Sequence, residues 1–133
     1  MREPGGPEER PSAGSSSLIL IVEDEVFIAL EVQALLLNHG FRVLGPAPSV
    51  EQALALLAAN KPDAAVLDVS LRGELVSPVA EALRRMRVPF VVTSAYDRPD
   101  RIAGEVLTGA PHLGKPTSDG ALLRALESVL DRE

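Results

Sequence analysis

The stretch AAVLD, residues 64–68, is an apolar run that ends in the acid Asp68. An apolar run without alternating polar residues is typical of a parallel strand buried on both faces. Other apolar runs also end in polar residues: Leu18–Val22 precedes Glu23, Asp24 and Glu25, Phe90–Val92 precedes Thr93 and Ser94, and His112–Gly114 precedes Lys115. The carboxyl ends of parallel strands share one edge of a sheet, outside which ligands bind. The sequence therefore predicts carboxylates, hydroxyls and a lysine gathered at one such edge.

Helical patterns alternate with these strands. We expect helices at 26–39, 49–58, 78–86 and 119–130, and a further short strand at 42–47. In the first helix, the apolar stripe at helical spacing consists of Phe27, Leu30, Ala34 and Leu37. Ser49 with Gln52 three residues later forms a capping-box pattern. Right-handed crossovers then predict a doubly wound α/β fold of five parallel strands, for which we expect the order 2-1-3-4-5, although periodicity alone does not fix it.

Two segments lack this regularity. Residues 98–109 are interrupted by Pro99, Gly104 and Gly109, and a glycine inside a helix costs about 1 kcal/mol relative to alanine. We therefore expect a short or mobile fourth helix there. Residues 1–17 are rich in proline, glycine and serine, which cannot bury enough surface to offset their ordering entropy. They are predicted to form a disordered tail before a single domain at 18–133.

Composition excludes several classes of protein. The chain has 133 residues, a net charge of −6 and no cysteine. The length suits one domain, and the missing cysteines exclude disulfides and thiolate metal sites and fit the cytoplasm. The acidic balance argues against nucleic-acid and anionic-membrane surfaces, and no apolar run approaches the roughly 20 residues of a membrane helix. Because nothing follows Glu133, we expect no output domain in this chain.

The acidic residues predicted at the sheet edge have a chemical consequence. Two like charges about 4 Å apart repel by about 4 kcal/mol at an effective dielectric near 20. Such a cluster either binds a cation or raises the pKa of one of its members. Oxygen ligands without cysteine favour a hard ion, and Mg²⁺ fits best. For any one acid taken alone, an ordinary solvated loop charge is the simpler interpretation; the combination with Ser94 and Lys115 favours a site.

Asp68 then has a role as a carboxylate nucleophile that forms an aspartyl phosphate. Lys115 would act as a point charge on a phosphoryl oxygen, and the Ser94 hydroxyl would donate to another. The alternatives are a plain surface lysine and a strand-end serine that caps a turn. Phosphorylation adds about −1.5 to −2 charges, which would pull on the loops that flank residues 98–109. That segment is the candidate conformational switch.

The chain resembles the receiver domain of bacterial response regulators from about Leu18 to Leu130. The motifs that carry the resemblance are LILIVEDE at 18–25, AVLDVSLRGE at 65–74, PFVVTSAYD at 89–97 and LGKP at 113–116. The resemblance implies a flavodoxin-like fold in which Asp68 accepts phosphate from a sensor histidine kinase or phosphotransfer protein. It also implies that Asp24 and Asp68 ligate Mg²⁺ directly, with Glu23 beside them and the Ser70 carbonyl completing the site. Ser94 and Lys115 match the family's hydroxyl and lysine.

A narrower resemblance is to a subgroup of mostly single-domain alphaproteobacterial receivers. That subgroup carries a Phe-Ala-Thr-Gly-aromatic motif at the fourth strand, where this chain has Thr93-Ser94-Ala95-Tyr96. Serine thus replaces threonine and alanine replaces glycine. The family's usual switch aromatic, three residues before the lysine, is His112 here. Tyr96 and His112 are therefore the candidate switch residues.

Several functions are compatible with these residues. The leading one is a stand-alone phosphoacceptor, which catalyses only its own phosphorylation and dephosphorylation and either signals through an unknown downstream protein or drains phosphate. The second is a pseudo-receiver, a constitutive protein-binding module without phosphotransfer. The third, a small aspartate-nucleophile hydrolase, would need an acid where Ser70 stands. A phosphohistidine or metal role for His39 or His112 is a weaker alternative, because each histidine is isolated in the sequence.

Overall fold

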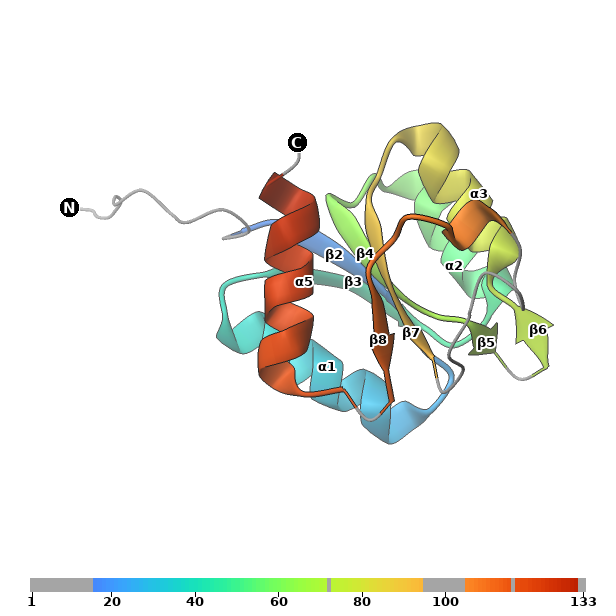
Figure 1. Cartoon of the computed structure of the whole chain (residues 1–133). Coiled ribbons are helices and arrows are strands. Elements are labelled where there is room, and N and C mark those ends of the chain that lie inside the picture. The colour runs from blue at the N-terminus through green and yellow to red at the C-terminus, as the bar shows by residue number, and fades with distance from the viewer. Residues whose placement is uncertain (1–15, 72, 95–104, 116, 132–133) are drawn as a thin grey trace.

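The computed structural model of the chain describes residues 16–71, 73–94, 105–115 and 117–131 (Figure 1). A parallel sheet of five strands forms its centre. The strands are β2 (Leu18–Val22), β3 (Arg42–Ala47), β4 (Ala64–Asp68), β7 (Phe90–Ser94) and β8 (His112–Gly114). They lie in the order β3-β2-β4-β7-β8. Counted along the chain this is 2-1-3-4-5, so the predicted doubly wound topology is confirmed.

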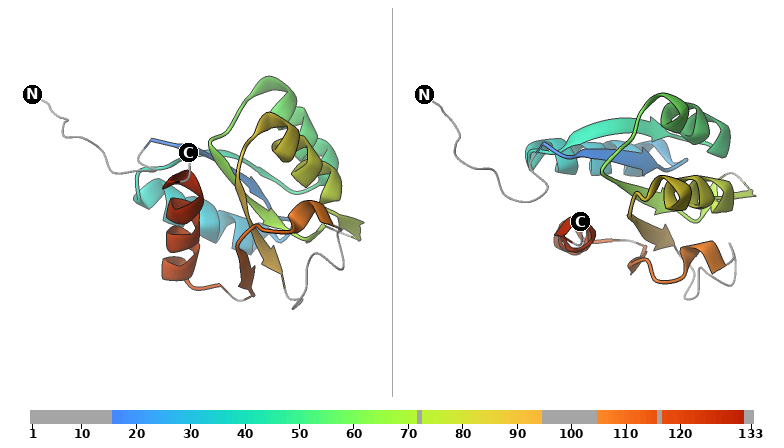
Figure 2. Two further views of the ribbon diagram at one scale, coloured as in Figure 1. Left: turned by 45° about the horizontal axis from the view of Figure 1, so that its top comes forward. Right: turned by 90° about the horizontal axis from the view of Figure 1, so that it is seen from above.

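In the part of the chain that the structure describes, four α-helices cover the two faces of the sheet (Figure 2). They are α1 (Val26–Asn38), α2 (Val50–Ala59), α3 (Ser77–Met86) and α5 (Asp119–Asp131). Buried side chains of α1 and α5 meet one face, and those of α2 and α3 meet the other. Successive residues of β2 alternate between the two layers: Ile19 and Ile21 contact the first, Leu20 and Val22 the second. A strand buried on both sides needs apolar residues at every position, which explains the unbroken runs.

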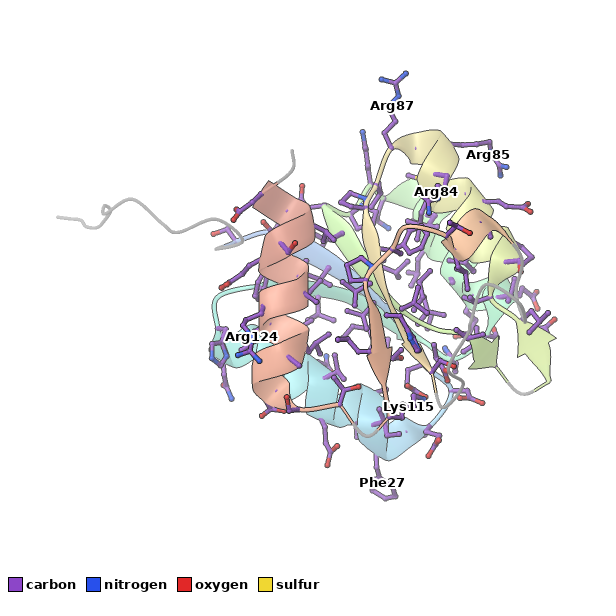
Figure 3. All side chains as sticks on the ribbon, in the orientation of Figure 1. Phe27, Arg84, Arg85, Arg87, Lys115 and Arg124 are labelled. Atoms are coloured by element: carbon purple, nitrogen blue, oxygen red, sulfur yellow. The ribbon has the colours of Figure 1, made fainter. Side chains whose placement is uncertain are left out.

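The apolar stripe predicted for α1 was wrong. Phe27 is 82% exposed, Leu30 51% and Leu37 52%, whereas Ala29 and Leu36 are buried. Figure 3 shows the Phe27 side chain projecting away from the body of the molecule. The helix sequence VFIALEVQALLLN is apolar on nearly every face, so periodicity does not determine which face meets the sheet.

A short hairpin follows Asp68 where a loop was expected. Strands β5 (Ser70–Leu71) and β6 (Glu74–Leu75) pair antiparallel outside the main sheet. The turn between them contains Gly73 at a φ of +87°, a conformation that favours glycine. The Val76 amide donates to the Val69 carbonyl at 2.9 Å and closes the base of the hairpin.

The irregular segment at 98–109 is described only from Glu105 onward. There a single 3-10 turn, η1 (Glu105–Leu107), precedes β8. Arg84 of α3 holds it: the guanidinium donates to the carbonyls of Val106 at 2.9 Å and Thr108 at 2.8 Å. Residues 1–15 and 95–104 lie outside the described residues, so the predicted tail and the mobility of this segment stay predictions. None of the described helices is long and apolar enough to cross a membrane.

The N-terminus of α2 provides a test of the local sequence signals. The Ser49 hydroxyl accepts a hydrogen bond from the Gln52 amide at 3.2 Å, as the sequence predicted. Replacing Ser49 by alanine removes this acceptor, so we expect Ser49→Ala to lower the free energy of unfolding by about 1 kcal/mol in chemical denaturation. Ser49→Asp keeps an acceptor and should retain most of the stability. Equal losses in both variants would show that the hydrogen bond is not what stabilises this helix.

Candidate functional site

Strand register brings the polar residues to one edge of the sheet. The β2–β4 pairing aligns Val22 with Leu67, so Glu23 and Asp68 follow at neighbouring positions. The β4–β7 pairing then sets Asp68 beside Thr93. On the far side of β7, Ser94 is aligned with Gly114, and Lys115 comes next in the chain. The prediction that the polar residues at the ends of these strands lie at one edge of the sheet is therefore confirmed.

Backbone contacts fix Glu23 at the end of β2. Its amide donates to the Ala47 carbonyl at 3.0 Å. Its carboxylate atom Oε2 accepts from the Glu25 amide at 3.1 Å. Gly45 lets β3 approach this closely, because a Cβ at that position would lie 3.1 Å from the Ile21 carbonyl oxygen and 2.8 Å from the Ala47 nitrogen. The side chain of Glu23 is thus held over the edge of the sheet.

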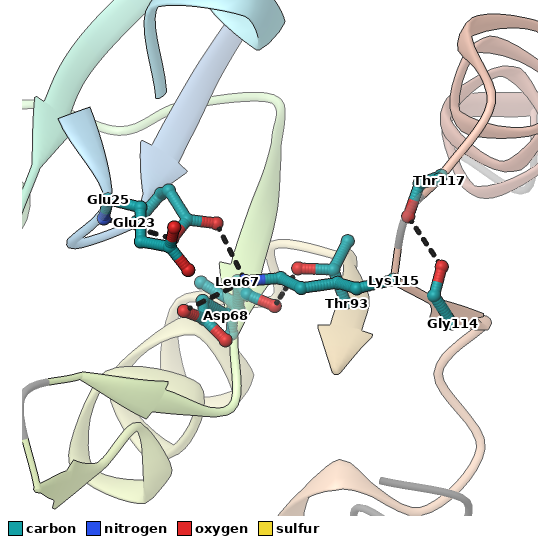
Figure 4. Close-up of polar contacts among 8 residues, drawn as sticks. All are labelled: Glu23, Glu25, Leu67, Asp68, Thr93, Gly114, Lys115 and Thr117. Carbon is teal, nitrogen blue, oxygen red and sulfur yellow. Dashed lines mark hydrogen bonds and ion pairs between the residues drawn. The ribbon is translucent and has the colours of Figure 1, made fainter. Parts of the chain in front are cut away.

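Lys115 connects two of the carboxylates (Figure 4). Its Nζ atom lies 3.1 Å from Glu23 Oε1 and 3.2 Å from Asp68 Oδ2. The Lys115 amide donates to the Ser94 carbonyl at 3.1 Å, and the Thr117 hydroxyl donates to the Gly114 carbonyl at 2.8 Å. These backbone contacts on both sides of Lys115 anchor the loop that carries the ammonium to the end of β8.

Three acids form a compact cluster. A carboxylate oxygen from each of Glu23, Asp24 and Asp68 lies within 4.8 Å of the other two. Glu23 and Asp68 are buried, and Asp24 is half-buried. The ammonium of Lys115 balances only one of these negative charges. The cluster consists of hard oxygen donors in a partly desolvated place, which is the donor set that Mg²⁺ prefers in proteins.

Burial and charge shift the protonation of this cluster. The pKa of Glu23 is raised from 4.5 to about 7, mainly because its carboxyl group is buried and to a smaller extent because the charge of Asp68 is near. The Glu25 amide and Lys115 oppose this shift without cancelling it. For Lys115, burial lowers the pKa, but Asp68 and Glu23 outweigh burial and raise it above its usual value. The lysine therefore stays charged, whereas one carboxyl of the cluster titrates near neutrality.

Two hydroxyl residues end β7. Ser94 is buried, with 1% of its surface exposed, and its carbonyl receives the Lys115 amide. Thr93 is also buried, and its hydroxyl donates to the Leu67 carbonyl at 3.4 Å. The structure thus puts both residues at the predicted edge and ties the Thr93 hydroxyl to the neighbouring strand. Ser70, the remaining predicted contributor, begins β5 two residues after Asp68.

The two histidines lie apart from the carboxylate cluster. His39 follows the end of α1, where its Nδ1 atom is 2.9 Å from the Leu35 carbonyl. His112 begins β8 beside Val92. Its buried Nε2 has no hydrogen-bond partner among the residues that the structure describes. Tyr96, the other predicted switch residue, lies outside the described residues.

Sequence reasoning missed a cleft beside the site, between α1 and α5. Its lining includes Glu23 and Lys115 of the site together with Thr117, Ser118 and Asp119. The Ser118 hydroxyl accepts from the Ala121 amide at 3.1 Å and so starts α5. The run Thr117-Ser118-Asp119 before an apolar helix is a recognisable start signal, and it would have located these residues near Lys115.

Known proteins match this chain along most of its length. The family model of the response regulator receiver domain covers residues 19–127. The transcriptional regulatory protein PdtaR of Mycobacterium tuberculosis is 29% identical over 129 residues, which are 96% of this chain and 63% of PdtaR. Protein PilH of Pseudomonas aeruginosa is 26% identical over 84% of this chain and 96% of PilH. The chain thus spans less than two thirds of PdtaR and almost all of PilH.

Solved structures agree with the sequence matches. The receiver domain of the response regulator PhyR from Erythrobacter litoralis superposes with a TM-score of 0.76 at 26% identity, covering 90% of this chain and 94% of that domain. The receiver domain of a diguanylate cyclase from Desulfovibrio desulfuricans shares the fold with a TM-score of 0.78 at 24% identity, covering 89% of this chain and 96% of that one. Given the family match across residues 19–127, the chain belongs to the response regulator receiver domain family.

Proposed function

We propose that this domain accepts a phosphoryl group on Asp68 in a Mg²⁺-dependent reaction. The observation that carries the proposal is the position of Lys115, whose ammonium contacts both Glu23 and Asp68 within a cluster of three carboxylates. The phosphoryl donor is a phosphohistidine on a sensor kinase or a phosphotransfer protein. Receiver domains are signalling domains, and phosphorylation of Asp68 would be the signal that this domain receives.

Asp68 acts as the nucleophile. One of its carboxylate oxygens bonds to phosphorus while the bond from phosphorus to the donor histidine nitrogen breaks, and the imidazole leaves with that electron pair. Little covalent chemistry is required of the protein, because phosphoryl transfer depends mainly on positioning and charge stabilisation. The 3.2 Å contact between Lys115 Nζ and Asp68 Oδ2 supports a role for the ammonium as the counter-charge of a phosphoryl oxygen. Ser94 is assigned as the hydroxyl donor to another oxygen.

Asp24 and Asp68 are assigned as direct ligands of Mg²⁺, with Glu23 beside them and the Ser70 carbonyl as a further donor. The mutual approach of the three carboxylates to within 4.8 Å supports this assignment. Bound Mg²⁺ supplies charge neutralisation for the carboxylates and the transferring phosphoryl group. The role of Lys115 is complementary, since it already balances one negative charge and leaves the rest to a divalent ion.

The exposed side chains of α1 suit contact with the phosphodonor protein. Val26 is 62% exposed and Phe27 82%. Both lie in the first turn of α1, directly after the loop that carries Asp24. Large exposed apolar residues next to a reaction site are typical of a protein-interaction surface. The signal is then passed to a downstream protein, with Tyr96 and His112 as the candidate switch residues.

Phosphorylation can be tested by mass spectrometry. We expect acetyl phosphate with Mg²⁺ to add one phosphoryl group to the protein, and Asp68→Asn to abolish this addition because it removes the nucleophile. Asp131→Asn, at the exposed end of α5, is the matched control and should be labelled normally. Labelling of Asp68→Asn at the control level would refute the site. Failure of the unaltered protein to be labelled would favour the alternative function, a constitutive protein-binding module.

The raised pKa of Glu23 predicts an unusual pH dependence of stability. The folded protein holds this proton up to a pH of about 7 and the unfolded chain only up to about 4.5, so the free energy of unfolding should fall as the pH rises between them. We expect a loss of about 2 kcal/mol between pH 5 and 7.5 in EDTA, measured by urea denaturation. Millimolar Mg²⁺ should restore stability at the higher pH, and Glu23→Gln should flatten the profile. A flat profile in the unaltered protein would contradict this account.

A further inference from the structure

The cleft between α1 and α5 has its own shape and chemistry. It has a volume of about 140 Å³. It exists because the two helices rest on different strands of the same face: α1 packs on β2 and β3, and α5 packs on β4 and β7. The base of the cleft is apolar and includes Val66 of β4 and Leu122 of α5, both buried.

Side chains of α1 form one wall of the cleft. Ile28, Val32 and Leu35 lie on this wall and are only half-buried. Val32 and Leu35 pack against the buried cluster that contains Leu36, but they are not fully enclosed as Leu36 is. Apolar side chains that border a gap lack contact partners on one side, so an apolar group of the right size would gain contacts with all of them. A cavity of about 150 Å³ is large enough to hold benzene.

The mouth of the cleft is acidic. Glu31 of α1 and Asp119 of α5 belong to the lining and are exposed, and Glu23 belongs to it and is buried. Among the described residues, Lys115 is the one cation in the lining, and it is already paired with Glu23 and Asp68. An apolar base under a mouth of net negative charge suits a ligand with a hydrophobic body and a cationic end.

We propose that the α1–α5 cleft is a binding site for a small hydrophobic amine. The benzene-sized or branched apolar part occupies the space between Val32, Leu35 and Leu122, and the ammonium group lies at the mouth near Glu31 and Asp119. The cleft shares Glu23 and Lys115 with the carboxylate cluster, but binding of the amine needs neither Asp68 as a nucleophile nor a phosphodonor. If Asp68 is not phosphorylated, the proposal of amine binding still stands. If the amine does not bind, the proposal of phosphorylation still stands.

Amide NMR titration of the full chain with phenethylamine tests the proposal. Phenylacetate, of similar size and opposite charge, is the matched ligand control. We expect saturable shifts in residues 28–35 and 117–122 with a Kd of about 0.1–1 mM for phenethylamine, a normal affinity for so few atoms. Phenylacetate should bind at least about tenfold more weakly, because one charge reversal changes attraction to both mouth carboxylates into repulsion. Equal binding of the two ligands, or no saturable shifts in these residues, overturns the proposal.

The carboxylate cluster is a competing place for an ammonium group. The titration is therefore run in millimolar Mg²⁺ and repeated in EDTA. Shifts in 28–35 and 117–122 that are the same in both conditions support the cleft. Binding that occurs only in EDTA and is centred on residues 23–25 shows that the amine merely replaces the metal, and it overturns the proposal.

Two variants separate the apolar and the charged contributions. Val32→Phe places a larger side chain in the cleft and should abolish phenethylamine binding in protein whose circular dichroism is unchanged. Glu31→Gln should weaken binding about two- to fivefold, the usual effect of one exposed charge pair. Glu51→Gln, an exposed position in α2 on the other face of the sheet, is the control and should bind normally. If Val32→Phe does not fold, Glu31→Gln decides, and undiminished binding in that variant overturns the proposal.

Discussion

The balance between three carboxylates and one ammonium at the edge of the sheet is the interaction that constrains the structure around it. Three carboxylates have oxygen atoms within 4.8 Å of one another, and a single ammonium, that of Lys115, lies among them. At an effective dielectric near 20, two like unit charges about 4 Å apart repel by about 4 kcal/mol, so charges this close oppose folding. The raised pKa of Glu23 follows mainly from burial of its carboxyl group, and the charge of Asp68 adds to it. The rest of the fold has to hold these groups together against this repulsion, and the four buried residues of β4 that precede Asp68 provide the rigid support.

Much of the carboxylate cluster could be predicted from the sequence, because one sequence pattern indicates both a buried strand and the edge of the sheet at which that strand ends. The run AAVLD shows a strand that is buried on both faces, and the polar residue at its end shows which edge carries the chemistry. The same logic located Glu23, Asp24 and Lys115 correctly at strand ends. Contacts between residues close in the chain could also be predicted, as in the hydrogen bond that the Ser49 hydroxyl accepts from the Gln52 amide.

The features that sequence reasoning missed depend on how elements rest on one another. The helix α1 is apolar on nearly all sides, so only packing on β2 and β3 determines that Ala29 and Leu36 are buried while Phe27 is exposed. The hairpin of β5 and β6 has two residues in each strand, too few for a period-2 pattern to emerge. The α1–α5 cleft comes from the spacing of two helices over different strands, which neither helix sequence encodes alone.

The cleft and the carboxylate cluster share Glu23 and Lys115, and this has a thermodynamic consequence. The ammonium of Lys115 contacts Asp68, and Lys115 is also part of the lining of the cleft. A group bound in the cleft and a phosphoryl group on Asp68 would therefore both change the surroundings of the same lysine. Coupling between two binding events is reciprocal, so whatever factor a cleft ligand imposes on the affinity for a phosphoryl mimic, the mimic must impose on the affinity for the ligand. Because a single side chain mediates the contact, this coupling requires no movement of the sheet or of either helix.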